Sequence, residues 1–279
     1  MINRVKNLVK KMLLGGGGKS PIVKVTLNTV APSERFVGKK VLVTGGSSGI
    51  GLEIAKEFLN EGAEVMITGR NTARLEEAKQ KLNNPRLKTI EWDVADVPSL
   101  DTKFVAAVAE MGHFDIFINN AGVWEEPQWE TIIESIYDKI CDTNAKGLFF
   151  MCQQEGSYLK TNKILGKIVN ICSVEGMMSK FQPYTVSKWS SIAITRGAAK
   201  EFVKHGIVVN GVAPGVVATN ISAWSRSINV GENAYVEIQK THRFTTVEEI
   251  ASMALYLSSD MASNIIGQVI AIDGGWVLN

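Results

Sequence analysis

The sequence has few cysteines, few histidines and no long apolar run, and each of these scarcities excludes a class of protein. Its three cysteines, Cys141, Cys152 and Cys172, form no Cys-x-x-Cys pair and have no histidine at metal-ligand spacing. This pattern predicts free thiols in a reducing, cytoplasmic setting and no metal site. No apolar stretch approaches the roughly 20 residues that cross a bilayer. Charges interrupt every apolar stretch near the N-terminus, which argues against a secretory signal.

Net charge is also small, at +2 for the whole chain. The basic residues are concentrated in residues 1–40, where nine lysines and arginines accompany one glutamate, which leaves 21 basic and 27 acidic residues in residues 41–279. A mildly acidic body is a poor match for the phosphate backbone of nucleic acids. We therefore expect no nucleic-acid partner.

The N-terminal segment has a character of its own. Apolar residues recur at helical spacing among lysines and arginines in residues 1–14, and four glycines at positions 15–18 end the pattern. The pattern predicts a short basic amphipathic helix that lies on an anionic membrane surface or contacts a partner. A solvated terminus and a helix packed on its own domain are the alternatives. Residues 19–38 are expected to be a linker.

From residue 39 onward, short runs rich in Val and Ile alternate with amphipathic stretches of helical length. The expected strands are 41–43, 64–68, 88–91, 115–118, 167–171, 207–212 and 268–272. The clearest expected helices are 50–60, 72–82, 100–111, 185–204 and 247–257. Consecutive β-branched residues are typical of strands buried on both faces. The alternation predicts a single α/β domain over residues 39–279, a doubly wound parallel (Rossmann) sheet of about seven strands with helices on both faces.

A glycine-rich turn, Thr44-Gly45-Gly46-Ser47-Ser48-Gly49-Ile50-Gly51, joins the first expected strand to the first expected helix. Gly45 allows a tight turn, Gly49 lets the backbone approach a pyrophosphate, and Gly51 permits close packing of helix on strand. The helix N-terminus adds N–H donors and the positive end of the helix dipole. The strand before and the helix after favour a dinucleotide-binding loop over a structural turn.

A second group of residues has the chemistry of proton transfer. Tyr184 and Lys188 are four apart at the start of an expected helix, so both project from one face. A phenol has a pKa near 10, and a nearby ammonium stabilises the phenolate and lowers that pKa towards the working range. Ser173 ends the fifth expected strand, at the sheet edge where ligands bind. The neighbouring Cys172 is the alternative polar group there.

These motifs together resemble the short-chain dehydrogenase/reductase family, in its main single-domain branch. The glycine loop, Asn119-Asn120-Ala121-Gly122 and the Tyr-x-x-x-Lys pair occur in the family's order, and the resemblance extends over residues 39–279. It implies hydride transfer between a nicotinamide cofactor and a carbonyl or secondary alcohol. An epimerase or dehydratase of the same fold, and a cofactor-binding scaffold recruited by the N-terminal helix, are the alternatives.

The resemblance also implies individual catalytic roles. Tyr184 is the general acid or base, Ser173 holds the substrate oxygen, and Lys188 tunes the phenol and orients the nicotinamide ribose. Asn144 holds a water that links Lys188 to solvent, although an Asn at this place also satisfies the backbone of a helix bend. Ser173 and Tyr184 are 11 residues apart, a shorter spacing than the family usually shows, which leaves the shape of the intervening loop and of the substrate pocket open.

Gly69 and Arg70 indicate NADP(H) rather than NAD(H). Gly69 stands where NAD enzymes place an acid for the ribose hydroxyl, and Arg70 offers a charge-assisted fork to a 2′-phosphate; a loop charge without a ligand is the other interpretation. The resemblance places Asp93 at the adenine amino group and Val94 against the ring, unless Asp93 is an N-cap. The expected cofactor-binding residues are Gly45, Ser47, Ser48, Gly49, Ile50, Gly51, Arg70, Asp93, Val94, Asn120, Ala121, Gly122, Tyr184, Lys188, Pro214, Gly215, Val217 and Thr219.

The substrate is a small carbonyl or alcohol whose class is left open between a 3-oxoacyl thioester, a sterol, a sugar or polyol, and a quinone. The expected lining residues are Trp124, Trp129, Glu175, Met177, Met178, Phe181, Gln182 and Trp224, and residues 220–243 are expected to form a lid. The resemblance further implies a homodimer or homotetramer, with interfaces on the helices around residues 130–160 and 185–204.

Overall fold

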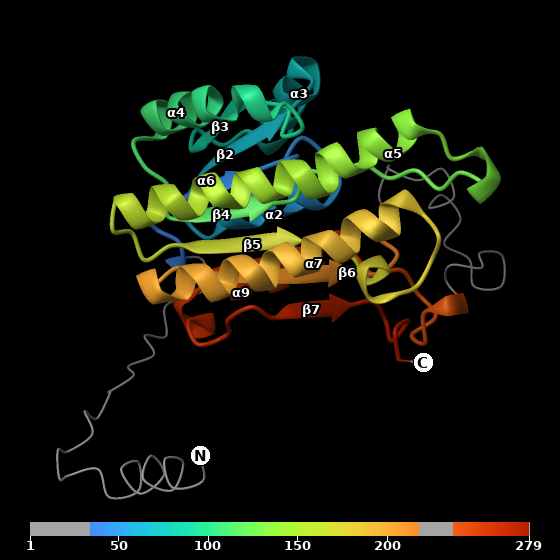
Figure 1. Ribbon diagram of the computed structural model, residues 1–279. Helices are drawn as coiled ribbons and strands as arrows, with labels where there is room; N and C mark the ends of the chain where they lie inside the picture. The colour runs from blue at the N-terminus through green and yellow to red at the C-terminus, as the bar shows by residue number, and fades with distance from the viewer. Residues whose placement is uncertain (1–33, 218–236, 279) are drawn as a thin grey trace, which may run out of the picture.

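One parallel sheet organises the computed structural model, which describes residues 34–217 and 237–278. Its strand order is β3-β2-β1-β4-β5-β6-β7. The strands are β1 (Lys40–Val43), β2 (Glu64–Gly69), β3 (Leu87–Glu91), β4 (Ile116–Asn119), β5 (Lys167–Ile171), β6 (Val208–Pro214) and β7 (Val269–Ile272). The chain starts in the middle of the sheet and winds out to one edge, then returns to β4 and winds out to the other (Figure 1). The predicted doubly wound fold in a single domain is confirmed.

Helices cover both faces of this sheet. They are α2 (Gly49–Asn60), α3 (Thr72–Leu82), α4 (Leu100–Met111), α5 (Glu134–Cys141), α6 (Leu148–Thr161), α7 (Pro183–Phe202) and α9 (Val247–Ser258). A π-helical segment, η4 (Asp142–Gly147), joins α5 to α6. Short 3-10 turns are η2 (Val97–Ser99), η3 (Trp129–Thr131), η5 (Val174–Met177), η6 (Val203–His205) and η8 (Asp260–Ala262).

The core divides into two layers because successive strand residues point to opposite faces. Val41 and Val43 pack with α2, α3 and α9 on one face. Leu42 packs with α4, α6 and α7 on the other, the near face in Figure 1. β1, β4 and β5 are almost wholly buried. β3 and β7 are only partly buried, since each has a single neighbouring strand, so the expectation of strands buried on both faces is wrong at the two edges.

The folded domain begins before residue 39. Phe36 is 2% exposed, and its ring packs edge-on against Phe58 of α2 with centroids 4.8 Å apart. Arg35 pairs with Glu61 at the end of that helix. The last part of the predicted linker is therefore held against α2 through Arg35 and Phe36. The predicted helix over residues 1–14, the glycines at 15–18, most of the linker, Thr219 and most of the lid lie outside the described residues.

The described part of the chain holds no helix with the length and apolar character needed to cross a membrane. All three cysteines are free, as expected; Cys152 and Cys172 are buried and Cys141 is half-buried.

A carboxyl group lies in the interior between α6 and the sheet. Glu155 of α6 is 0% exposed, and its Oε2 accepts a hydrogen bond of 2.9 Å from Asn119 Nδ2 at the end of β4. The same Asn119 Nδ2 lies 3.0 Å from Asn170 Oδ1 on β5. Burial raises the pKa of Glu155 to about 8, although the Asn119 hydrogen bond opposes the rise. The native protein therefore holds Glu155 protonated at neutral pH.

We expect Glu155→Gln to stabilise the protein increasingly as pH rises. The folded pKa of about 8 exceeds the value of 4.5 for a solvated Glu, so the stability that Glu155 contributes is fully present below pH 4.5 and is lost as pH rises through 8. One pKa unit corresponds to about 1.36 kcal/mol, so the free energy of unfolding of the parent protein should fall by on the order of 3 kcal/mol between pH 5 and pH 8 from this group. Urea unfolding of both proteins from pH 5 to 8.5 measures it. Glu110→Gln, on the exposed end of α4, is the control, and a constant difference between Glu155→Gln and the parent at all pH values would contradict the expectation.

Candidate active site

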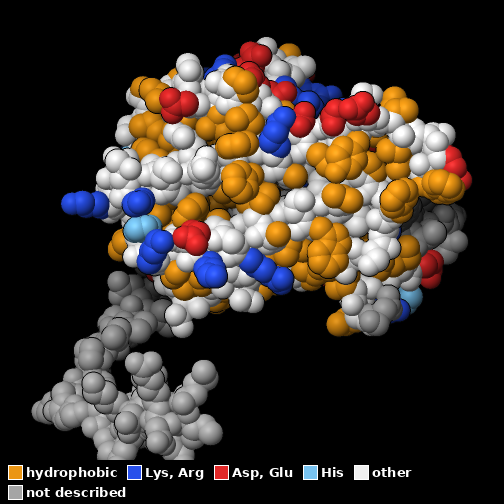
Figure 2. Space-filling view, viewed as in Figure 1, with side chains coloured by type: hydrophobic (Ala, Val, Ile, Leu, Met, Phe, Trp, Pro, Cys, Tyr) orange, Lys and Arg blue, Asp and Glu red, His pale blue; other side chains and the backbone are white. Residues whose placement is uncertain are grey.

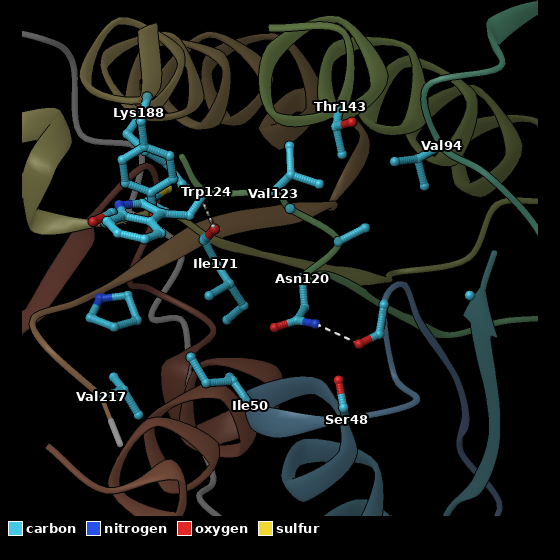
Figure 3. Close-up of a pocket in the computed structure, with 18 of the residues that line it drawn as sticks. Ser48, Ile50, Val94, Asn120, Val123, Trp124, Thr143, Ile171, Lys188 and Val217 are labelled. Atoms are coloured by element: carbon cyan, nitrogen blue, oxygen red, sulfur yellow. Dashed lines mark hydrogen bonds between the residues drawn. The ribbon is translucent and has the colours of Figure 1, made fainter. Parts of the chain in front are cut away.

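A cavity of about 400 Å³ opens along the carboxyl ends of the strands. The residues around it come from the β1–α2 turn, from the ends of β2, β4, β5 and β6, and from the first turns of α7. Figure 3 shows Lys188 and Trp124 at one end, Val94 at the other, and Asn120 between them. Ligands of open α/β sheets bind at this edge, where the strand order reverses.

The glycine loop of residues 44–51 forms a close turn into α2. Gly45 has φ +63°, and a Cβ on it would stand 2.9 Å from the Ala121 Cα. A Cβ on Gly51 would stand 2.4 Å from Asn120 Nδ2, so this glycine packs the helix against the end of β4 rather than lining the cavity. Ser48 caps α2 without a side-chain hydrogen bond, which leaves the first N–H groups of the helix to meet an anion. The loop therefore fits a pyrophosphate.

The end of β4 is tied to this loop. Thr44 Oγ1 accepts from the N–H groups of Asn120 and Ala121 at 3.0 and 3.1 Å. Asn120 Nδ2 donates to the carbonyl oxygens of Thr44 and Gly45, both at 3.0 Å. These hydrogen bonds join the ends of β1 and β4, and they hold the small residues Ala121 and Gly122 at the cavity wall.

Two arginines line the end of the cavity beside β2. Arg70 was expected there, and Arg74, one turn into α3, joins it. The α3 N-cap Asn71 accepts from the Arg74 N–H at 3.0 Å, which fixes the first turn of the helix. Gly69 adds no side chain, and a Cβ on it would stand 3.3 Å from Ser47 Oγ. The end of β2 therefore offers two cations and a hydroxyl to the cavity, and residue 69 itself adds no carboxylate.

Asp93 and Val94 line the cavity between β3 and the β4 end, together with the buried Trp92. Asp93 Oδ1 accepts from the N–H of Ala95 at 3.0 Å. That contact is a local turn rather than a helix cap, because η2 begins after Asp96. The N-cap alternative for Asp93 is therefore wrong.

Tyr184, Lys188 and Ser173 meet at the other end of the cavity. Ser173 hydrogen-bonds to the Tyr184 phenol. Lys188 Nζ lies 5.6 Å from the centroid of the Tyr184 ring and donates to the carbonyl of Ile171 at 3.3 Å. Cys172 also lines the cavity, but its Sγ contacts Thr195 of α7 at 3.7 Å.

The pKa of the Tyr184 phenol is raised above its usual value rather than lowered. Loss of hydration at the cavity wall is the largest cause; the hydrogen bond from Ser173 opposes it, and the Glu175 carboxylate adds to it. Lys188 does not offset the rise, since its ammonium lies over the ring and donates to Ile171. Burial also lowers the pKa of Lys188 itself. The expected lowering by Lys188 is therefore wrong for this geometry, and Tyr184 is a protonated phenol at neutral pH.

Asn144 lies buried in the π-helical segment η4. Its Oδ1 accepts from Val123 N and its Nδ2 donates to Val123 O, both at 2.8 Å. Nδ2 also donates to Ser187 Oγ on α7 at 3.1 Å. A Cβ on Gly122 would meet both Asn144 Oδ1 and Lys188 Nζ within 4 Å, so this amide stands beside the lysine while it holds the strand-four loop in place.

The substrate end agrees with the expected lining only in part. Trp124 and Glu175 line the cavity. Phe181 and Trp129 are 81% and 60% exposed and lie outside it. Met177 and Met178, in the short loop between Ser173 and Tyr184, pack into a small core cluster with Trp276. Gln182 instead donates to the carbonyl of Pro127 at 2.9 Å, and Trp224 lies outside the described residues.

Pro214, Gly215 and Val217 line the cavity after β6, as expected. A Cβ on Gly215 would stand 2.7 Å from the Asp273 Cα, so this position allows β6 to pass close to the end of β7. Sequence reasoning missed several lining residues that carry functional groups, among them Arg74, Glu126 and Trp276. Arg74 had a local signal, since it lies in the first turn of the expected helix, four residues after Arg70.

Comparisons with known proteins point to enzymes. A family model described as enoyl-(acyl carrier protein) reductase matches residues 45–277. Gluconate 5-dehydrogenase of Gluconobacter oxydans is 35% identical over 242 residues, covering 85% of this chain and 94% of the relative. Galactitol 2-dehydrogenase of Agrobacterium fabrum is 32% identical over 253 residues, covering 86% and 98%. Among solved structures, levodione reductase superposes with a TM-score of 0.80 at 28% identity, covering 86% of this chain and 98% of that one.

Proposed function

The chain belongs to the short-chain dehydrogenase/reductase family, and on that premise we propose that it interconverts a carbonyl and a secondary alcohol with NADP(H) as the hydride carrier. It is an oxidoreductase, as its relatives named for gluconate and galactitol are. The observation that carries the proposal is one cavity lined by the glycine loop, by Arg70, and by the cluster of Tyr184, Ser173 and Lys188.

The proton is moved by the chain's own residues. When bound, the nicotinamide ring supplies or accepts the hydride. Tyr184 gives a proton to the carbonyl oxygen in reduction and takes it back in oxidation. Ser173, hydrogen-bonded to the phenol, directs a donor at the charge that develops on the same oxygen. Lys188 holds the ribose hydroxyls beside the tyrosine, and Asn144 connects the lysine to solvent through a water.

The charges at the adenosine end of the cavity support NADP(H) in this proposal. Arg70 and Arg74 line it and Gly69 places no carboxylate there. Phosphate and guanidinium form strong, charge-assisted hydrogen bonds, whereas a carboxylate at residue 69 would repel a 2′-phosphate. Asp93 and Val94 meet the adenine, and Pro214, Gly215 and Val217 meet the nicotinamide side.

The test is consumption of free NADPH, followed optically against a panel of ketones, ketoses, diketones and 3-oxoacyl thioesters. We expect oxidation of NADPH with at least one member and slower oxidation with NADH. An epimerase or dehydratase, which returns its cofactor unchanged, would convert substrate without consuming NADPH. A scaffold would bind NADPH with no turnover of any member.

We also propose that the protein is a homo-oligomer built through the helices on the near face of Figure 1. Figure 2 shows hydrophobic side chains gathered over these helices. The exposed apolar residues there are Tyr137 of α5, Phe149 and Phe150 of α6, and Val186 and Trp189 of α7. Trp189 and Phe149 are 52% and 50% exposed, and apolar patches of this kind mark association sites. A second copy of the chain covers both by two-fold symmetry.

We expect Phe149→Glu to shift the protein to monomers, because it places a charge in the centre of this apolar contact. Sedimentation velocity measures the shift. Leu165→Glu, at a residue 75% exposed beyond the far end of α6, is the matched control and keeps the assembly. A parent protein that sediments as a monomer at all concentrations would refute the proposed interface.

A further inference from the structure

A charged cluster borders the cavity at the end occupied by Tyr184. Glu126, from the loop after β4, and Glu175, of η5, line the cavity. Lys180, from the loop before α7, pairs with both carboxylates: it donates to Glu175 Oε1 and lies 3.6 Å from Glu126 Oε1. These three residues are called the Glu–Lys–Glu cluster below. The Gln182–Pro127 hydrogen bond of 2.9 Å ties its two loops together.

The cluster is held next to the reacting groups. The Glu175 N–H donates to Ser173 Oγ at 3.2 Å, and Glu175 Oε2 accepts from Thr185 Oγ1 at 2.8 Å. Glu175 is close enough to Tyr184 for its charge to raise the pKa of the phenol. A substrate whose carbonyl oxygen lies at Tyr184 and Ser173 therefore has its neighbouring carbon atoms beside the cluster.

Two tryptophans complete this end of the cavity. Trp124 and Trp276 both line it, and Lys180 Nζ lies 5.6 Å from the centroid of the Trp276 ring. Indole rings pack against C–H groups, while their N–H supplies a polar edge. The combination of rings with ionised groups suits a ligand whose carbon skeleton carries polar substituents.

The charge of the cluster selects among such ligands. It holds two carboxylates and one ammonium, so its net charge is −1. Among the described residues that line this end, the other cation is Lys188, which donates to the Ile171 carbonyl. A carboxylate on the substrate would meet two like charges and would have to displace an existing partner of Lys180. A hydroxyl both donates and accepts, so it bridges an ammonium and a carboxylate without disturbing the pair.

We propose that the site takes an uncharged, polyhydroxylated substrate, a polyol or its ketose, whose hydroxyls next to the reacting carbon bind the Glu–Lys–Glu cluster. This inference rests on the proposed function, which it narrows to one substrate class. Glu126 and Lys180 are the specificity residues in it: Glu126 lines the cavity, Lys180 pairs with both lining carboxylates, each side chain is 34% exposed, and neither takes part in proton transfer. Sugar acids are discriminated against by charge.

The experiment compares uncharged and acidic substrates of matched length. Galactitol and sorbitol form the uncharged set, and gluconate and galactonate the acidic set, all with six carbons; each is oxidised with NADP⁺ and NADPH formation is followed. We expect the best kcat/KM in the uncharged set. Glu126→Gln is expected to raise KM for the best polyol and to lower KM for the acids. The ratio of kcat/KM for the polyol to kcat/KM for the acids should therefore fall by about tenfold, which corresponds to about 1.4 kcal/mol. Glu125→Gln, one residue away and paired with Lys139 outside the cavity, leaves the ratio unchanged.

The outcomes separate this inference from the proposed function. A higher kcat/KM for the acids, or a Glu126→Gln variant that changes both sets in the same direction, overturns the polyol assignment. Reduction of a diketone or 3-oxoacyl thioester by NADPH, with no oxidation of any polyol, also overturns it while the oxidoreductase stands. Failure with every carbonyl and alcohol overturns both.

Discussion

Replacement of Tyr184 by Phe is expected to lower kcat by about 10²–10⁴-fold, the range over which a positioned general acid or base acts. The substitution keeps the ring at the cavity wall and removes the hydroxyl that Ser173 contacts. Binding of NADPH, measured by fluorescence titration, is expected to remain within about twofold because the glycine loop and the arginines are untouched. Tyr256→Phe, on α9 and outside the cavity, is the matched control.

Unchanged turnover in Tyr184→Phe would remove the tyrosine from the mechanism. Ser173→Ala and Cys172→Ala then identify which hydroxyl or thiol holds the substrate oxygen. Cys172 is hydrogen-bonded towards α7, so its removal is expected to cost far less activity than removal of Ser173.

The raised pKa of Tyr184 gives the two directions of reaction different pH profiles. Reduction needs the protonated phenol, which the raised pKa keeps populated across neutral pH. Oxidation needs the phenolate, so its rate is expected to increase as pH rises. Because the Glu175 carboxylate contributes to the raised pKa, Glu175→Gln moves the rise of the oxidation profile to lower pH.

Replacement of Arg70 or Arg74 by Ala is the second change with a large expected effect: the variant should lose the proposed preference for NADPH over NADH. Both line the cavity, and a hydrogen bond to a charged group contributes roughly 1.5–3 kcal/mol. Each substitution should therefore weaken NADPH binding by about tenfold to a hundredfold and leave NADH binding almost unchanged. Dissociation constants for both cofactors measure the effect without turnover.

Two further variants make this prediction specific. Gly69→Asp places a carboxylate at the end of β2, where the new Cβ would stand 3.3 Å from Ser47 Oγ and 3.5 Å from Leu75 Cδ2. This variant is expected to bind NADH more tightly than NADPH. Lys79→Ala removes a cation from the last turn of α3, away from the cavity, and should leave both constants as they are. If Arg70→Ala weakens the binding of NADH and NADPH equally, Arg70 does not contact the 2′-phosphate.

The parts of the fold that were predictable are those set by local pattern. Continuous runs of Val and Ile indicate strands that are buried between two neighbouring strands and two layers of helices. One of these strands, β5 (Lys167–Ile171), has the predicted bounds. The turn at residues 44–51 could be predicted because glycine is required there for steric reasons; Gly45, for example, has a φ of +63°. The packing of Phe36 on Phe58 was not readable, since nothing in a short polar stretch indicates which distant helix it meets.

The candidate site divides in the same way. Tyr184, Lys188 and Ser173 follow from motif order, and the cavity brings them together. The Glu–Lys–Glu cluster joins loops more than fifty residues apart in the chain, and Trp276 arrives from the C-terminal end of the sheet. The raised pKa of Tyr184 was also beyond reach, because it depends on how far burial removes water from the phenol.

The π-helical segment at Asp142–Gly147 fixes how many residues can lie between α5 and α6 if the side chains of α6 are to keep their orientation. A regular α-helix advances about 100° per residue, and a π turn accommodates one residue more than an α turn does. Deleting one residue there would either rotate Asn144 away from Val123 or turn every later position of α6 by about 100°. Glu155 would then leave its place beside Asn119 and Phe149 would leave the surface face. One surplus residue thus keeps Asn144, the buried Glu155 and the exposed Phe149 in their observed places, and we expect this stretch to tolerate no change of length while the flanking loops accept it.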